Sequence, residues 1–383
     1  MPELPEVQTT VDGIEAHTKG LIIADAWTDY GSKFHIGKNN IANPEFFTKF
    51  RKSVKGAKIA KAHRRGKNVL VDLDNGKTII IHMKMTGHVM YGSYKKLAKK
   101  DPQGEQWRPT DSKNAALNDP FNRFIHLVLP FTNGKSLVLS DMRKFAKVSL
   151  ADTQDLALSE HLSTHGPEPL DKDFTAETFK GALMKRPRGK IKQTMMDHTI
   201  VSGIGNIYSD EILWRAGVHP LRKVEDVNNK EWKLLYKAMR ETLLRGIDFG
   251  GDSMSDYRNI LGERGKFQNE HNAYQKTGER CKKRGCSGTI CRIKVGGRSG
   301  HYCDKHQHWA YNTRHGHLQG TIQRIRLVFQ PSHRPQHHLV LHRRISERDG
   351  QGRTLPQTTR PTRYRRGIRG QTHQYGDSAK TDS

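Results

Sequence analysis

Apolar positions along the chain follow two periods, first that of β-strands and later that of helices. Strand-like runs at 68–73 and 77–83 flank one Asn-Gly dipeptide, and runs at 124–129 and 135–140 flank another. Asn-Gly between two such runs is the strongest short-range signal for a β-hairpin. We therefore predict antiparallel β-structure, a sandwich or a barrel, for this part of the chain.

Helical spacing occurs on both sides of the strands. Residues 2–20 carry apolar side chains at helical spacing and predict a leading helix. From about residue 154 the pattern is helical again, most clearly at 230–247. The chain is thus predicted to be α+β, with an N-terminal β-sandwich after one helix and a helical region after the sandwich.

Three segments depart from both periods. Residues 95–120 are polar and predict a long surface loop, and residues 252–272 predict a mobile loop. Beyond residue 310 there are thirteen Arg but one Lys and little periodicity, which indicates a disordered basic tail. The predicted domains are 1–153 (sandwich), 154–272 (helices), 273–310 (cysteine-containing hairpin) and 311–383 (tail).

The charge of the chain points to an anionic partner. Its 383 residues include 66 Lys and Arg against 39 Asp and Glu, a net charge of +27. Nucleic acid is the first expectation and an anionic membrane surface the second. No run approaches the 18 apolar residues of a membrane span, and the start lacks the pattern of a secretory signal. We therefore expect a cytoplasmic protein.

All four cysteines lie close together, which in a reducing compartment favours metal ligation over disulfides. Cys281 and Cys286 form one pair, and Cys303 and His306 form a second pair beyond a predicted hairpin. Three thiolates and one imidazole suit a structural zinc ion and leave no open position for catalysis. Cys291 is the alternative fourth ligand. We prefer His306 because Cys291 lies in the predicted strand.

The N-terminus offers a candidate nucleophile. Pro2 permits removal of Met1, which would expose a secondary amine. At pH 7 roughly one α-amino group in ten is neutral, against roughly one lysine in 2,500. Such an amine can attack a carbonyl-like carbon while Glu3 moves protons. By itself, however, such a start more often means only that acidic residues stabilise a helix dipole.

A third motif, Gly-Ile-Gly-Asn-Ile-Tyr at 203–208, places two glycines before a helix. The free N–H groups of the helix start and the Asn206 amide would form an anion site suited to a DNA backbone. An ordinary packing joint between two helices is the alternative. The basic run at 185–192 precedes the motif, although such runs are more often solvated surface.

Together these motifs resemble the formamidopyrimidine-DNA glycosylase family, whose members excise 8-oxoguanine and ring-opened purines. The resemblance runs from the N-terminus to about residue 310, with the motifs in the family's order. It implies a β-sandwich with a leading helix, a helical domain with a helix–two-turn–helix motif, and a zinc β-hairpin. It also implies damaged duplex DNA as partner, one structural Zn²⁺ and a monomer.

The resemblance assigns roles at the reacting centre. Pro2 resembles the nucleophile that attacks the sugar C1′, and Glu3 resembles its acid/base partner, with Glu6 in the same pocket. Lys67 resembles the lysine that assists β-elimination. Arg298 resembles the zinc-finger arginine that grips the flanking phosphate and assists δ-elimination. These roles imply strand cleavage on both sides of the damaged nucleotide.

Further residues resemble the family's DNA contacts. Met85, Arg143 and Phe145 resemble side chains that fill the gap left by a flipped nucleotide. Without the family, Met85 and Phe145 would be expected in the core. Asn206 and Lys192 resemble residues that hold phosphates or the lesion.

The chain also departs from the family. Asn122 lies where a base-contacting His-x-His stretch is usual, and we retain it as a candidate DNA contact. The first cysteine pair has four intervening residues instead of two, and His306 replaces a cysteine. The segments 95–120 and 311–383 have no counterpart.

We therefore expect a DNA glycosylase and abasic-site lyase. The loop from Gly250 to Phe267 resembles the family's purine-lesion loop and favours oxidised purines over the oxidised pyrimidines of the endonuclease VIII branch. A non-catalytic zinc DNA-binding protein is the alternative of a different class, disfavoured by the set Pro2, Glu3 and Lys67. Membrane-surface binding through the basic tail is also disfavoured, because the sequence shows no amphipathic helix for it.

Overall fold

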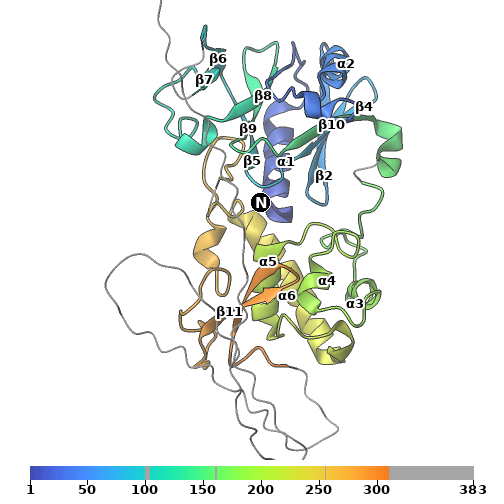
Figure 1. Cartoon of the computed structure of the whole chain (residues 1–383), viewed down its shortest axis with the longest axis vertical. Coiled ribbons are helices and arrows are strands. Elements are labelled where there is room, and N and C mark those ends of the chain that lie inside the picture. Colours follow the sequence, from blue (N-terminus) through green and yellow to red (C-terminus); the bar gives the residue numbers. More distant parts are fainter. Residues whose placement is uncertain (100–103, 160–161, 255, 310–383) are drawn as a thin grey trace, which may run out of the picture. The chain divides into compact units, whose positions relative to one another are not determined.

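The computed structural model describes residues 1–99, 104–159, 162–254 and 256–309 (Figure 1). Antiparallel sheets come first and helices follow, which confirms the predicted α+β class. No helix in these ranges is long and apolar enough to span a membrane. The basic tail predicted for 311–383 lies outside the described residues.

Two four-stranded antiparallel sheets form the N-terminal part, and a shared apolar core lies between them. The first sheet consists of β1 (Trp27–Thr28), β8 (Ile125–Pro130), β9 (Ser136–Asp141) and β5 (Gly87–Gly92), in that order. The second consists of β10 (Lys147–Asp152), β4 (Lys77–His82), β3 (Asn68–Leu73) and β2 (Ile59–Arg65). Both predicted hairpins are confirmed: Gly76 and Gly134 have φ of +74° and +81° in the turns, a region that favours glycine.

The leading helix α1 (Leu4–Thr18) contributes side chains to two cores. Val7, Val11 and Ile14 belong to the core of the sandwich. Leu4 belongs to the core formed by the later helices, and its N–H donates to the Gly203 carbonyl at 3.0 Å. The first residues of the chain are therefore fixed where the two cores meet.

The helical part is built on a long amphipathic helix, α6 (Asn229–Asp248), as the 230–247 pattern predicts. Its apolar face is buried, and Asn228 and Glu231 form a capping box with hydrogen bonds of 3.0 and 2.9 Å at its start. The remaining helices are α2 (Pro44–Val54), which belongs to the N-terminal part, and α3 (Ala176–Met184), α4 (Ile191–Met195) and α5 (Asn206–Ala216).

Two hairpins complete the described chain. The hairpin predicted between the cysteine pairs is present as β11 (Ile290–Val295) and β12 (Arg298–Cys303). The prediction that 95–120 is only a loop is wrong, because β6 (Tyr94–Lys96) pairs with β7 (Trp107–Pro109). The Trp27 and Trp107 rings lie 5.5 Å apart and pack this second hairpin on the sandwich.

Replacing Gly246 by alanine should destabilise the protein, although alanine is ordinarily the better helix residue. A Cβ at this position in α6 would lie 2.6 Å from the Tyr208 hydroxyl oxygen and 2.8 Å from Cγ of Pro5. Both neighbours are buried. We expect a loss of about 1–3 kcal/mol in the free energy of unfolding, measured by urea denaturation.

Gly181→Ala is the matched control. Gly181 lies in α3, and a Cβ there would have no atom within 4 Å. It should gain about 0.5–1 kcal/mol from helix propensity alone. A gain of similar size for Gly246→Ala would show that the close approach of α6 to Tyr208 is not a constraint.

Candidate active site

The carboxylate of Glu3 lies at the start of α5. Glu3 is 2% exposed, and its oxygens accept hydrogen bonds from the N–H groups of Gly205 at 2.7 Å and Ile207 at 3.0 Å. The first N–H groups of a helix have no partner inside the helix and carry partial positive charge. The anion site predicted at the glycine motif therefore exists, and in the structure it holds the chain's own carboxylate.

A second buried carboxylate, Glu6, lies beside the first. It accepts from the Tyr208 hydroxyl, the Asp252 N–H and the Glu3 N–H, each at 2.7 Å. Burial, and then the negative charge of Glu3, raise the pKa of Glu6 to about 7, against the opposing effect of the hydrogen bonds. Near pH 7 Glu6 is therefore present in both its neutral and its ionised form.

Sequence reasoning missed two members of this network. Tyr208 lies inside the Gly-Ile-Gly-Asn-Ile-Tyr motif, so its position was a usable signal. Asp252 contributes through its backbone N–H, which no side-chain pattern could have indicated.

The N-terminus, Lys67 and Arg298 line one cavity of about 380 Å³. Lys67 and Glu3 both touch Gly205, since a Cβ there would lie 2.6 Å from Lys67 Nζ and 2.5 Å from Glu3 Oε1. Burial lowers the pKa of Lys67, and the nearby Arg298 lowers it further, while Glu3 opposes both effects. The structure therefore brings together the catalytic residues that the sequence predicted.

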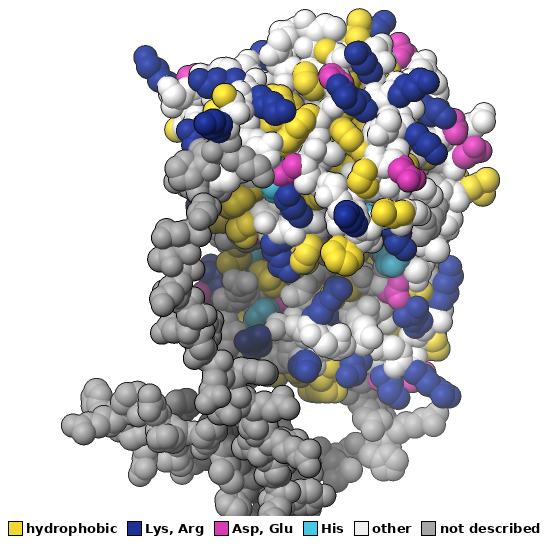
Figure 2. Space-filling model, turned by 45° about the horizontal axis from the view of Figure 1, so that its top comes forward, with side chains coloured by type: hydrophobic (Ala, Val, Ile, Leu, Met, Phe, Trp, Pro, Cys, Tyr) yellow, Lys and Arg dark blue, Asp and Glu magenta, His cyan; other side chains and the backbone are white. Residues whose placement is uncertain are grey.

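The remaining wall of this cavity is basic. Lys84 and Lys147 give it positive charge, His82 and His165 also line it, and no acidic side chain is among the described residues that line it. Burial and then the charges of Lys84 and Lys67 lower the pKa of His82 to about 3. Basic side chains also outnumber acidic ones on the face drawn in Figure 2. Such a wall favours a polyanion.

The three predicted gap-filling side chains are exposed on neighbouring turns. Met85 is 43% and Phe145 51% exposed, so the alternative that they are core residues does not hold. The guanidinium carbon of Arg143 lies 4.5 Å from the Phe145 ring centroid. The Arg143 N–H donates to Thr86 Oγ1 at 3.3 Å, which ties the two turns together.

Lys192 lies inside the protein, whereas a DNA contact would have to lie on its surface. Its side chain is fully buried, and its ammonium contacts Asp210 at 2.7 Å and Ser209 Oγ at 2.8 Å. A buried cation is retained only with such partners. The prediction that Lys192 contacts DNA is therefore corrected: it is an internal ion-pair partner.

Asn122 is likewise buried, so the prediction that it contacts DNA is also corrected. Its amide donates to the carbonyls of Ala116 at 2.7 Å and Gly262 at 3.1 Å. Its Oδ1 lies 2.8 Å from His88 Nε2. These contacts occupy the side chain and leave it no surface to present to a base.

Asn206 and Arg298 meet in a second pocket, which also includes Tyr274 and Arg292. Asn206 is half-buried, and Arg298 is exposed at the start of β12. Arg298 thus belongs to both pockets and links the hairpin of β11 and β12 to the cavity at the N-terminus.

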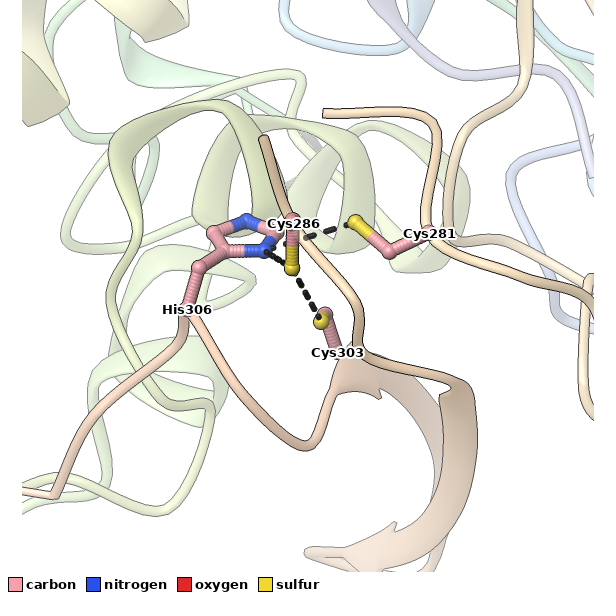
Figure 3. Close-up of side chains that lie close together, drawn as sticks. All are labelled: Cys281, Cys286, Cys303 and His306. Carbon is pink, nitrogen blue, oxygen red and sulfur yellow. Dashed lines mark hydrogen bonds between the residues drawn. The ribbon is translucent and has the colours of Figure 1, made fainter. Parts of the chain in front are cut away.

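The predicted metal ligands form a compact cluster. The ligand atoms of Cys281, Cys286, Cys303 and His306 all lie within 4.8 Å of one another (Figure 3). His306 Nε2 lies 2.9 Å from the Trp214 carbonyl oxygen, which leaves Nδ1 facing the sulfurs. Cys291 pairs with Tyr302 in the hairpin and is outside the cluster. The set of three cysteines and one histidine can therefore hold a metal ion.

Comparison with known proteins agrees with this geometry. The model of the formamidopyrimidine-DNA glycosylase N-terminal domain matches residues 1–148, and the model of that family's H2TH domain matches residues 165–258. The chain belongs to the formamidopyrimidine-DNA glycosylase family. It is accordingly an enzyme of the DNA glycosylase type, with the helix–two-turn–helix element expected from the sequence.

Individual members of the family are similar over most of the chain. The formamidopyrimidine-DNA glycosylase of Ruegeria sp. (strain TM1040) is 32% identical over 307 residues, 80% of this chain and all of the relative. Lactococcus lactis Fpg, solved with DNA containing an abasic site, is 30% identical with a TM-score of 0.65 and covers 80% of this chain and 99% of its own. A complex of that Fpg with Fapy-dG-containing DNA has a TM-score of 0.64 at 30% identity, with the same coverage.

Glu6→Gln should remove a pH dependence from the stability of the fold. The pKa of Glu6 is about 7 in the folded protein against an ordinary value of 4.5. A carboxyl group whose pKa is raised by folding contributes its full stabilisation at pH values below its ordinary pKa. This stabilisation is lost as the pH rises through the pKa of the folded state. Relative to the variant, the wild type should lose about 3 kcal/mol between pH 4 and pH 8 in urea denaturation. A difference that stays constant over this range would contradict the assignment.

Proposed function

We propose that the protein excises oxidised purines such as 8-oxoguanine and formamidopyrimidines from duplex DNA and then cuts the abasic strand, with Pro2 as nucleophile. The observation that carries this proposal is the meeting of the N-terminus, Lys67 and Arg298 on one basic cavity beside Glu3. The Lactococcus lactis complexes with abasic-site and Fapy-dG DNA support the same lesion class.

The covalent chemistry begins once Met1 is removed. The lone pair of the Pro2 nitrogen forms a bond to the sugar C1′ as the base leaves with the electrons of its glycosidic bond and takes up a proton. The Pro2 nitrogen then loses its proton, and opening of the sugar at the C1′–O4′ bond, with protonation of O4′, gives an iminium. We assign the proton transfers at this stage to Glu3, which lies within the same buried network.

Strand cleavage follows from the acidity of the iminium. Loss of a C2′ proton expels the 3′ phosphate, and a second loss at C4′ expels the 5′ phosphate, so that both backbone bonds break. We assign the first elimination to Lys67, because its lowered pKa leaves more of it neutral and able to accept a proton. Arg298 would neutralise a departing phosphate from its place on β12.

The damaged nucleotide must leave the helix to reach this cavity. We propose that Met85 and Phe145 replace its stacking and that Arg143 contacts the unpaired base on the other strand. Their exposure on adjoining turns and the Arg143–Phe145 contact support this assignment. Asn206 would hold a backbone phosphate together with Arg298.

We further propose that Zn²⁺ is held by Cys281, Cys286, Cys303 and His306. Thiolate and imidazole donors in this number fit tetrahedral zinc. The ion would supply a structural cross-link and no reactive position. Its effect on the reaction is indirect, because the hairpin that it closes carries Arg298.

Borohydride added during reaction with a duplex containing 8-oxoguanine should trap a covalent adduct. Peptide mapping should place the adduct on Pro2 in chains that lack Met1. Lys67→Ala should still release the base but should cut the strand about 100-fold more slowly, the size of effect expected for a lost general base. Lys230→Ala, which changes an exposed lysine of α6, is the matched control and should behave as wild type.

Other outcomes would overturn definite parts of the proposal. If no adduct forms with the lesion duplex or with an abasic duplex, the protein would be a non-catalytic DNA-binding protein instead. Trapping on an abasic or oxidised-pyrimidine duplex, with no action on 8-oxoguanine, would retain the lyase and overturn the purine assignment.

Metal analysis tests the ligand set directly. Purified protein should contain one zinc ion per chain, and Cys286→Ser should lose it. Cys291→Ser should retain it, because Cys291 is outside the cluster. Loss of zinc from both variants alike would show that the fourth ligand is wrongly assigned.

A further inference from the structure

The inserted segment that contains β6 and β7 is tied to the segment that follows α6. Both carboxylate oxygens of Asp119 accept from Arg258, with N···O distances of 3.1 and 3.2 Å. The Asn122 amide reaches the Gly262 carbonyl nearby. Each contact spans about 140 residues of sequence. The insertion therefore fixes a segment that begins in the helical part of the chain.

Arg258 is enclosed at this junction. It is 2% exposed, and its guanidinium carbon lies 4.8 Å from the ring centroid of Phe121. A buried cation is costly without an anionic partner, so its place depends on Asp119. Its Nη1 group donates a hydrogen bond to the carbonyl of Tyr257 at 2.9 Å. The guanidinium thus joins the Asp119 carboxylate to the backbone at Tyr257.

From Tyr257 the contacts continue to the N-terminus. The Tyr257 carbonyl also accepts from Ser253 Oγ at 2.8 Å, and the Tyr257 hydroxyl donates to the Glu6 carbonyl at 3.0 Å. The adjacent Asp252 N–H donates to the Glu6 carboxylate. Glu6 in turn accepts from the Glu3 N–H. An unbroken series of contacts therefore leads from the insertion to the reacting end of the chain.

We propose that Asp119 and Arg258 are positioning residues for the reaction at the N-terminus. They hold Asp252 and Tyr257 against α1, and these two keep Glu6 in its place. The inference rests on the proposed function, since it takes the N-terminal amine as the reacting group. When the ion pair is broken, the reactive arrangement is populated for a smaller fraction of the time, and the rate falls with that fraction.

A double-mutant cycle tests the proposal on the full chain. The rate of borohydride-trappable adduct formation is measured on an abasic duplex in single turnover, with enzyme in saturating excess. Asp119→Asn and Arg258→Met should each slow it about tenfold, with DNA affinity within about twofold of wild type. The double variant should be no slower than either single one, because all three break the same link.

Two further variants separate positioning from general damage. Asp119→Glu keeps the carboxylate and should recover most of the rate. Arg108→Gln removes the ion pair of Arg108 with Glu105 (2.9 Å) inside the same insertion and should leave the rate unchanged. A slow Arg108→Gln variant would mean that the insertion acts only through its own folding, and would overturn the proposal.

Hydrogen exchange supplies a readout that does not need activity. In Asp119→Asn the backbone amides of Asp252, Ser253 and Tyr257 should exchange faster, while those in the middle of α6 should not. Unchanged exchange and rate in both single variants, or a roughly hundredfold effect in the double variant, would overturn the inference. If wild type itself forms no adduct, the proposed function fails instead.

Discussion

The buried carboxylate of Glu3 fixes the N-terminal end of the molecule, where we propose that the reaction takes place. An ionised carboxylate out of water is costly unless hydrogen-bond donors surround it, and the first N–H groups of α5 provide these donors. Gly205 is required there because any side chain would collide with the carboxylate and with Lys67. The loop before α5 must therefore lie directly against α1, and the two halves of the chain meet at this point.

Acidic and basic side chains occupy different places around the N-terminus: Glu3 and Glu6 are buried together, whereas lysines and Arg298 line the cavity. Burial, and then the negative charge of Glu3, raise the pKa of Glu6, so it retains a proton to higher pH than an ordinary glutamate. The cavity that includes Met1 also includes Lys67, Lys84 and Lys147, and burial, together with neighbouring positive charges, lowers the pKa of His82 and Lys67. An approaching phosphate backbone would offset these positive charges, whereas Glu3 and Glu6 are buried.

Local signals account for what the sequence could predict. Asn-Gly turns fix the hairpins, the capping box at Asn228 begins α6, and the spacing of the metal ligands reveals their cluster. The burial of Lys192 and Asn122 was not predictable in this way. Each depends on a partner elsewhere in the chain, Asp210 for the one and Gly262 for the other. The hairpin of β6 and β7 was missed for a similar reason, since it packs through Trp27, a residue of a distant strand.

The contacts of α1 also determine the order in which the molecule can be completed during synthesis. The partners of Glu3 lie about 200 residues later in the chain, and those of Glu6 extend to Asp252. At about 5–20 residues per second, the first residues wait about 10–40 s on the ribosome before these partners exist. The N-terminal end can be enclosed only after these later partners exist, and Pro2 is buried in the finished fold. The removal of Met1, which the proposed reaction requires, would therefore meet the least enclosed N-terminus during this interval.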